Sequence, residues 1–271
     1  MKLTLVTGAS GFVGRQVLNR LVQAGCPIRV VARAPVSGQS DVVKTNDLFS
    51  ESPQFWRSAF DGVGRIIHLA WYVEPGQYLT SKLNLDCMVG TLRMASAAAD
   101  AGVSRFVGIG TCLEQDPTQG AITTRTPLQP NSPYAAAKAG TFLALSQILP
   151  RMGVDFAWCR LFYLYGEGED GRRLVSYLHN RLSCGQIAEL TSGLQFRDYM
   201  DVSEAGRLIA EVSLSKACGV FNICSGKAVT VEELAGRIAE QYGRPDLLRF
   251  GVRQENADDQ ACVIGEPSII D

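Results

Sequence analysis

The chain has 271 residues, of which 46% are hydrophobic, and a formal net charge of −1. A chain of this size can bury a full core as one large domain or as one and a half. Because lysine and arginine are spread along the sequence, we expect neither a nucleic-acid-binding nor a membrane-binding surface. No stretch approaches the roughly 18 apolar residues of a membrane span, and Met1-Lys2 leads straight into a predicted strand, so we expect no signal peptide.

The eight cysteines fall mostly inside apolar runs and never form a Cys-x-x-Cys pair. This pattern predicts reduced core residues of a cytoplasmic protein, not a zinc site or a disulfide framework. His68 and His179 are the only histidines, and His68 lies inside a predicted strand. We therefore expect no metal site.

Short β-branched runs alternate with helical stretches through the first 160 residues. Strands are predicted at residues 3–7, 28–33, 42–44, 65–70, 106–110 and 155–160. Helices are predicted between them at residues 14–24, about 54–60, 79–101 and 132–149. The alternation predicts an α/β fold of Rossmann type, with a parallel, doubly wound sheet and helices on both faces.

The rhythm changes after Arg160. Helices are predicted at residues 174–182, 202–212 and 231–242, with short strands near Glu189, Asp198 and Phe221. We expect a nucleotide-binding domain over residues 1–165. Residues 166–271 would form a smaller α/β lobe that contacts substrate, although some of its elements could return to the first domain.

A glycine-rich turn follows the first predicted strand and opens the first helix. Its glycines allow a tight turn and a close approach of the backbone to a pyrophosphate, which the helix N-terminus would attract. The alternative, an ordinary glycine loop, does not explain the strand–turn–helix context. The predicted dinucleotide contacts in this turn are Gly8, Ser10, Gly11, Phe12, Val13 and Gly14.

The end of the second predicted strand bears on the choice of cofactor. An acid there would bind a ribose 2′-hydroxyl, whereas an arginine accepts a 2′-phosphate. The strand ends Val31-Ala32-Arg33, and Arg15 follows the last glycine of the turn. The two guanidinium groups favour NADP(H), while NAD(H) stays possible because Arg33 could simply be solvated.

Tyr134 and Lys138 are four residues apart and share one face of a predicted helix. The preceding Asn131-Ser132-Pro133 supplies a helix cap and a first-turn proline, so Tyr134 lies in the first turn. An ammonium beside a phenol, helped by a cationic nicotinamide, would lower a pKa that starts near ~10. The pair is therefore predicted to donate and accept a proton, and Thr111 at a strand end is a candidate partner.

These features together resemble the extended short-chain dehydrogenase/reductase family. The resemblance places Thr111, Tyr134 and Lys138 on the catalytic residues and gives Lys138 a second role, holding the nicotinamide ribose. It places Asp47 and Leu48 beside the adenine, and the run His68-Leu69-Ala70-Trp71 beside the cofactor. Further matches are Arg160–Gly166, Arg197–Val202 and Val220–Gly226. Cys87 stands where the family has a helix asparagine, and Asn84 lies one turn earlier.

Within the family, the chain looks similar to bacterial nucleotide-sugar 4-ketoreductases and epimerases such as CDP-paratose/abequose synthases. Cys112 and Leu113 replace two acids of the dehydratase branch, so dehydration is discounted. Arg197 is implied to bind the substrate diphosphate, and Glu114 is either a sugar-hydroxyl acceptor or an exposed loop acid. The complete set of predicted substrate contacts is Cys112, Glu114, Tyr163, Arg172, Arg197 and Arg253.

The sequence thus predicts an NADP-dependent reductase that acts on the 4-keto group of a nucleotide-linked deoxysugar. The alternatives are a 4-epimerase with retained cofactor and, from another class, a non-catalytic NADP-binding protein. By analogy with the family, the helices near residues 79–101 and 132–150 are expected to pair two copies as a homodimer.

Overall fold

A computed structural model describes residues 2–255 and 260–270 of the chain. A seven-stranded parallel sheet with the order β10-β6-β5-β4-β1-β2-β3 lies at its centre. The strands are β1 (Leu3–Thr7), β2 (Ile28–Ala32), β3 (Val42–Lys44), β4 (Val63–His68), β5 (Arg105–Thr111), β6 (Asp155–Leu161) and β10 (Gly219–Ile223). The order reverses between β1 and β4, which is where an open α/β sheet binds its ligand. The predicted Rossmann-type sheet is confirmed.

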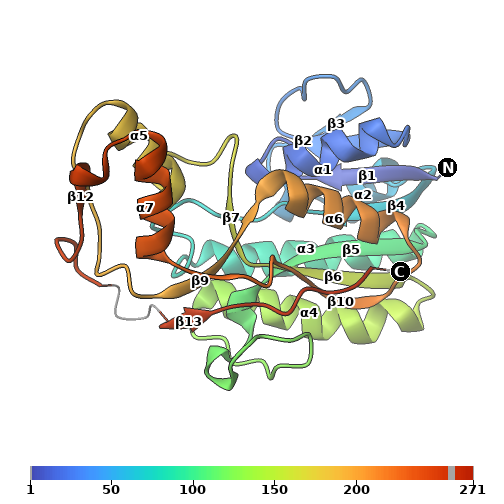
Figure 1. The fold of residues 1–271 in the computed structure, drawn as a ribbon. Helices are drawn as coiled ribbons and strands as arrows, with labels where there is room; N and C mark the ends of the chain where they lie inside the picture. The colour runs from blue at the N-terminus through green and yellow to red at the C-terminus, as the bar shows by residue number, and fades with distance from the viewer. Residues whose placement is uncertain (1, 256–259, 271) are drawn as a thin grey trace.

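Helices cover both faces of this sheet (Figure 1). One apolar core joins the sheet to α1 (Phe12–Gln23) and α6 (Val202–Leu214). A second core joins it to α2 (Pro53–Ala59), α3 (Leu83–Asp100) and α4 (Pro133–Arg151). The strands are buried from both sides, which explains their nearly continuous apolar runs.

A smaller lobe projects beyond one end of the sheet (Figure 1). Its own apolar core lies between α5 (Leu174–Ser183), α7 (Val231–Gln241) and the strand pair β8 (Ala188–Glu189) and β12 (Leu248–Arg249). A four-stranded sheet made of β7 (Tyr163–Tyr165), β9 (Phe196–Asp201), β11 (Ala228–Thr230) and β13 (Cys262–Val263) connects this lobe to the main sheet.

The second part of the chain returns to the first. β10 is the edge strand beside β6, and α6 packs closely on α1, where a Cβ on Gly206 would come within 2.5 Å of the Gln16 side chain. The strand expected near Phe221 thus belongs to the main sheet. Sequence proximity to the smaller lobe concealed this pairing, because β6 and β10 lie far apart in the chain.

Helix α3 begins at Leu83, later than the predicted residue 79. The Asn84 amide donates hydrogen bonds to the carbonyl oxygens of Tyr78 and Ser81, at 2.6 and 2.9 Å, and so closes a turn ahead of the helix. Among the described residues, no helix has the length and apolar character needed to cross a membrane.

Candidate active site

The glycine-rich turn has the geometry of a phosphate cradle. Gly8 adopts a φ of 71°, and a Cβ on Gly14 would lie 2.0 Å from the Gly8 carbonyl oxygen, so both positions require glycine. Gly11 caps α1 without a side-chain hydrogen bond. The first-turn amides that include Phe12 and Val13 therefore face the turn with the positive end of the helix dipole. These residues fit a dinucleotide pyrophosphate.

A buried chain of hydrogen bonds joins the end of β1, just before this turn, to α3. The Thr91 hydroxyl donates to the Cys87 carbonyl at 2.7 Å, and it therefore accepts the Nε2 proton of His68, at 2.9 Å. His68 Nδ1 then accepts from the Thr7 hydroxyl at 2.8 Å. Burial lowers the pKa of His68 to about 3, so the imidazole stays neutral. Cys87, which stands where the family has asparagine, contributes its backbone to this chain.

The other predicted cofactor contacts lie in α1 or follow β2, β3 and β4. Leu69 and Ala70 follow β4, where the Ala70 backbone lies so close to Gly8 that a Cβ on Gly8 would collide with it. Leu48 is buried, and the exposed Asp47 accepts a hydrogen bond from the Phe49 amide at 3.1 Å. Arg33 is exposed just beyond β2. The exposed Arg15 directs its guanidinium at the loop after β7, 3.2 Å from where a Gly168 Cβ would lie.

Tyr134 and Lys138 lie at the start of α4, as predicted. The Ser132 hydroxyl caps the helix by accepting from the Ala135 amide at 3.2 Å, and Pro133 occupies the first turn. Thr111 ends β5 beside them, and its side chain acts to lower the pKa of Tyr134. The structure thus brings the three predicted catalytic residues together at the carboxyl edge of the sheet.

Lys138 is held in a dry pocket. Its ammonium donates to the Ile109 carbonyl at 2.7 Å and lies 3.8 Å from the ring centroid of Trp71, while the residue is only 4% exposed. Burial lowers the pKa of Lys138 to about 7. The Trp71 indole in turn donates to the Asn84 side chain at 2.8 Å. Asn84 therefore reaches Lys138 only through the indole.

The environment of Tyr134 differs from the expectation. Burial is the main reason that the pKa of Tyr134 lies above its ordinary value, and the neighbouring Tyr78 raises it further. The ring of Tyr78 packs edge-on against Tyr134 at 4.9 Å between centroids. The hydrogen bond from Thr111 opposes the shift. In the protein without cofactor, Tyr134 is therefore a protonated phenol, as a proton donor must be.

Glu114 is neither exposed nor turned toward a sugar, contrary to both expectations. Its carboxylate is 0% exposed and pairs with Arg160 Nε at 2.8 Å. It also accepts from the Trp158 indole at 3.2 Å and from the Thr111 amide at 2.8 Å. Burial raises the pKa of Glu114, and Arg160 opposes the shift. Because all these partners are donors, the ionised carboxylate is the form that this site holds.

Cys112, a predicted substrate contact, lies in a buried apolar cluster with Ile122, Phe162, Cys224 and Val263. Its side chain therefore packs in the core. Tyr163 is half-buried, and its ring lies 5.2 Å from the guanidinium of Arg197. Arg197 is itself buried and donates to the Phe196 carbonyl at 2.7 Å.

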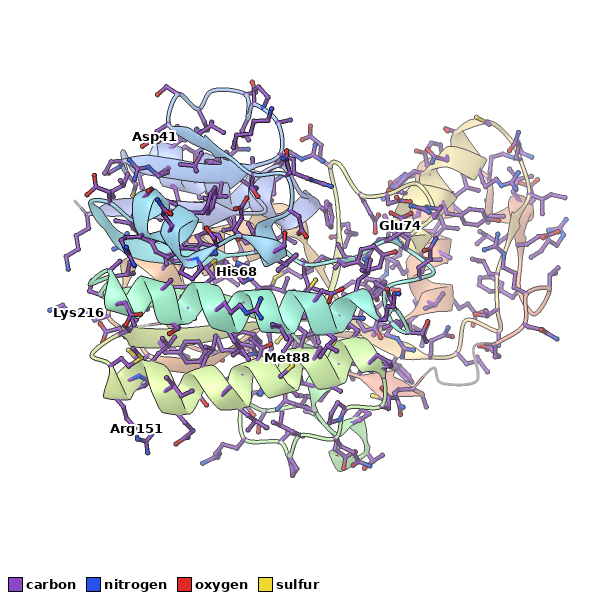
Figure 2. All side chains as sticks on the ribbon, turned by 180° about the vertical axis from the view of Figure 1, so that it is seen from behind. Asp41, His68, Glu74, Met88, Arg151 and Lys216 are labelled. Carbon is purple, nitrogen blue, oxygen red and sulfur yellow. The ribbon has the colours of Figure 1, made fainter. Side chains whose placement is uncertain are left out.

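Arg172 and Arg253, the exposed arginines among the predicted substrate contacts, already have protein partners. Arg172 forms ion pairs with Asp170 at 2.7 Å and with Glu74 at 2.8 Å, and Glu74 lies where the smaller lobe meets the main one (Figure 2). Arg253 stacks on Tyr177, 4.4 Å from the ring centroid. Arg173, which is not among the predicted substrate contacts, precedes α5 and acts electrostatically on Tyr78, the neighbour of Tyr134. Only its place at a predicted helix start pointed to it.

The sequence profile of the NAD dependent epimerase/dehydratase family matches residues 4–224, which include the glycine turn and the three catalytic candidates. The chain belongs to this family.

Relatives within the family carry out several reactions. The chain is 25% identical to the dTDP-6-deoxy-L-talose 4-dehydrogenase (NAD(+)) of Aggregatibacter actinomycetemcomitans, over 96% of this chain and 98% of that protein. It is 30% identical to a dTDP-glucose 4,6-dehydratase of Streptomyces griseus, over 88% and 78%. The fold matches the crystal structure of the UDP-glucose 4-epimerase of Thermus thermophilus in complex with NAD, at 22% identity and a TM-score of 0.84, over 98% and 90% of the two chains.

Proposed function

We propose that the protein reduces the 4-keto group of a nucleotide-linked deoxysugar with NADPH. The observation that carries the proposal is the meeting of Thr111, Tyr134 and Lys138 at the carboxyl end of β5, beside the glycine turn. The similarity to a sugar-nucleotide 4-dehydrogenase over nearly the whole of both chains supports the same carbon as the reacting centre.

Each residue of the group has a role that its surroundings permit. A bound nicotinamide supplies the hydride. Tyr134 is protonated and gives its phenolic proton to the oxygen of the reacting carbonyl. The Thr111 hydroxyl donates a hydrogen bond to the same oxygen, and Lys138, with a pKa lowered to about 7 by burial, orients the cofactor ribose.

Dehydration is disfavoured although several relatives are dTDP-glucose 4,6-dehydratases. Elimination of water needs an acid and a base beside the sugar. Cys112 is buried in an apolar cluster, and Leu113 has no titratable group. Glu114, the nearest acid in sequence, is committed to Arg160 and Trp158.

The preference for NADPH rests on Arg33 and on the absence of an acid in Val31-Ala32-Arg33. Titration with NADPH and NADH, followed by nicotinamide fluorescence, tests it with Arg33→Asp beside the parent. We expect tighter NADPH binding in the parent and a preference for NADH in the variant. Equal affinities, or cofactor that stays bound through purification, would contradict the preference and favour the epimerase.

The nucleotide diphosphate is assigned to Arg197, whose planar guanidinium suits phosphate oxygens. Arg197 lies on β9, which connects the main sheet to the smaller lobe. Arg173 at the start of α5 adds a second cation on the smaller lobe. Tyr163 is proposed to line the sugar site through its contact with Arg197.

A homodimer is proposed through the outer face of α3 and α4, which lie side by side (Figure 2). Met88 of α3 packs against Gly140 of α4, and Leu85 and Leu143 are exposed. Leu143→Arg is expected to convert a dimer into a monomer in light scattering. A dimer that persists in this variant would place the interface elsewhere.

The free thiols of the described cysteines suit a reducing compartment, so a cytoplasmic location stays a prediction.

A further inference from the structure

Glu114 lies at the centre of a buried cluster with Arg160 and Trp158, next to the catalytic candidate Thr111. Arg160 and Trp158, two residues apart on β6, turn their side chains to one face of the sheet. On β5 the paired positions are Gly110 and Gly108. A Cβ on Gly110 would lie 2.2 Å from the Trp158 nitrogen and 2.4 Å from a Glu114 oxygen, so both glycines make room for this cluster.

Stability alone does not account for such a cluster. Taking a glutamate and an arginine out of water costs several kcal/mol per ion, and apolar replacements of similar volume are often at least as stable. Arg160 is 2% exposed and Glu114 is 0% exposed, so both bear the full desolvation cost. What the pair provides is fixed geometry, because the carboxylate receives hydrogen bonds on both oxygens.

That geometry acts directly on Thr111. Glu114 Oε1 accepts the Thr111 amide at 2.8 Å, while the Thr111 hydroxyl accepts the Leu113 amide at 3.3 Å. A hydroxyl has a single proton, and the amide of Leu113 uses one of its lone pairs. Its proton and its second lone pair remain available to Tyr134 and to a substrate oxygen, and the Thr111 side chain lowers the pKa of Tyr134.

The cluster also reaches the catalytic helix. Tyr134, Lys138 and Phe142 follow one another at four-residue spacing on one face of α4. The Arg160 guanidinium lies 4.9 Å from the ring centroid of Phe142. The pair thus links the end of β5 to the helix that carries Tyr134 and Lys138.

We infer that Glu114 is a positioning residue, which fixes the Thr111 backbone so that the Thr111 hydroxyl is held beside Tyr134 and the substrate oxygen. The inference rests on the proposed function, and it adds to that function a residue that touches neither substrate nor cofactor. Its negative charge also acts on the two titrating groups, because it raises the pKa of both Tyr134 and Lys138.

Two matched double variants separate positioning from charge. Glu114→Gln with Arg160→Met keeps an acceptor for the Thr111 amide, whereas Glu114→Leu with Arg160→Met removes it, and neither leaves an unpaired buried charge. In the leucine variant we expect amide exchange at Thr111, followed by NMR, to accelerate at least roughly tenfold. The glutamine variant is expected to keep its protection. Unchanged protection in the leucine variant would overturn the inference without any use of substrate.

Kinetics give the second readout. The leucine variant is expected to lose roughly 10- to 100-fold in kcat with KM nearly unchanged, because a displaced donor impairs the transition state. In a Thr111→Val background the same change should cost less than about twofold. Equal losses in the two backgrounds would mean that Glu114 only maintains the fold. If the parent turns over no 4-keto sugar, the proposed function fails, while the exchange result still decides the positioning.

The pH profile of the glutamine variant tests the role of the Glu114 charge. It can be measured even if the leucine variant does not fold. This variant also loses the Arg160 charge, but Glu114 is the member of the pair that raises the pKa of Tyr134 and Lys138, so its loss should lower both pKa values. Reduction requires protonated Tyr134, so the high-pH limb of kcat should move to lower pH. A lower kcat with an unmoved limb would contradict this role of Glu114.

Discussion

The catalytic end of the main sheet and the arginines of the smaller lobe hold their charges in opposite ways. Lys138 and Glu114 are 4% and 0% exposed, and each is fixed by short hydrogen bonds to the protein. Arg172, in contrast, is 56% exposed and pairs with surface carboxylates. Buried groups cannot exchange partners cheaply, whereas surface ion pairs contribute little and rearrange readily. The catalytic groups are therefore held in place before substrate binds, whereas exposed substrate contacts such as Arg172 can change partners.

The largest effect should follow from removing the proton donor. Tyr134→Phe is expected to lower kcat by roughly 10²- to 10⁴-fold, the range of general acid catalysis, with NADPH affinity within about threefold of the parent. Tyr72→Phe is the matched control, since it loses only an exposed hydrogen bond to Gln77. Near-normal turnover by Tyr134→Phe would show that Tyr134 does not supply the proton for reduction.

Arg197 is the exception among the substrate arginines, because it is buried beside Tyr163. Arg197→Lys keeps the charge but loses the planar fork, so KM should rise about 10- to 100-fold, matching the roughly 1.5–3 kcal/mol of a charged hydrogen bond. Arg253→Lys, on the surface ring of Tyr177, should change KM less than about threefold. Equal effects of the two substitutions in steady-state kinetics would erase the distinction between buried and surface arginines.

The dry pocket of Lys138 gives a smaller, pH-dependent effect. Trp71→Ala admits water, so the pKa of Lys138 should rise from about 7 toward its ordinary value. If charged Lys138 holds the cofactor, NADPH affinity weakens as the pH passes this pKa, and in the variant the weakening should move to higher pH. Binding titrations across pH 6–10 check this, with Trp71→Phe, which keeps a ring over the ammonium, as the control. Identical profiles for the alanine variant and the parent would contradict it.

The smallest effect concerns stability. Folded His68 has a pKa lowered to about 3 by burial, whereas the unfolded chain has the ordinary value near 6.5. The unfolded state therefore binds more protons below pH 6.5, and stability falls as the pH drops toward 3, by at most about 1.4 kcal/mol per pH unit. Denaturant unfolding of His68→Gln should show a shallower decline between pH 6.5 and 4. A slope unchanged in His68→Gln would contradict the buried-histidine explanation.

Local sequence predicted the glycine turn and the start of α4 well and the supporting contacts poorly. The glycine turn and the Ser132-Pro133 cap act within a few residues, so their spacing was sufficient. The contacts of Glu114 depend on the β5–β6 register, which brings it to Trp158 and Arg160, 44 and 46 positions away in the chain. Gly108 and Gly110 were the available signal, because two glycines facing one way in a buried strand leave room for large neighbours.

The substrate half was harder for the same reason. Arg172 meets Glu74 across the two lobes, and Cys112 joins a cluster contributed by four separate segments. Neither arrangement follows from spacing along the chain. The surface residues therefore kept several possible roles until the fold placed them.

Deuterium transfer tests the central claim most directly. NADPH deuterated at nicotinamide C4 is incubated with a 4-keto-6-deoxysugar nucleotide, and the product is examined by NMR. We expect one deuterium at sugar C4, one NADPH consumed per product, and loss of both in Tyr134→Phe. Failure to reduce the 4-keto sugar, together with inversion at C4 of the matching 4-hydroxy sugar nucleotide without NADPH consumption, would contradict reduction and identify an epimerase.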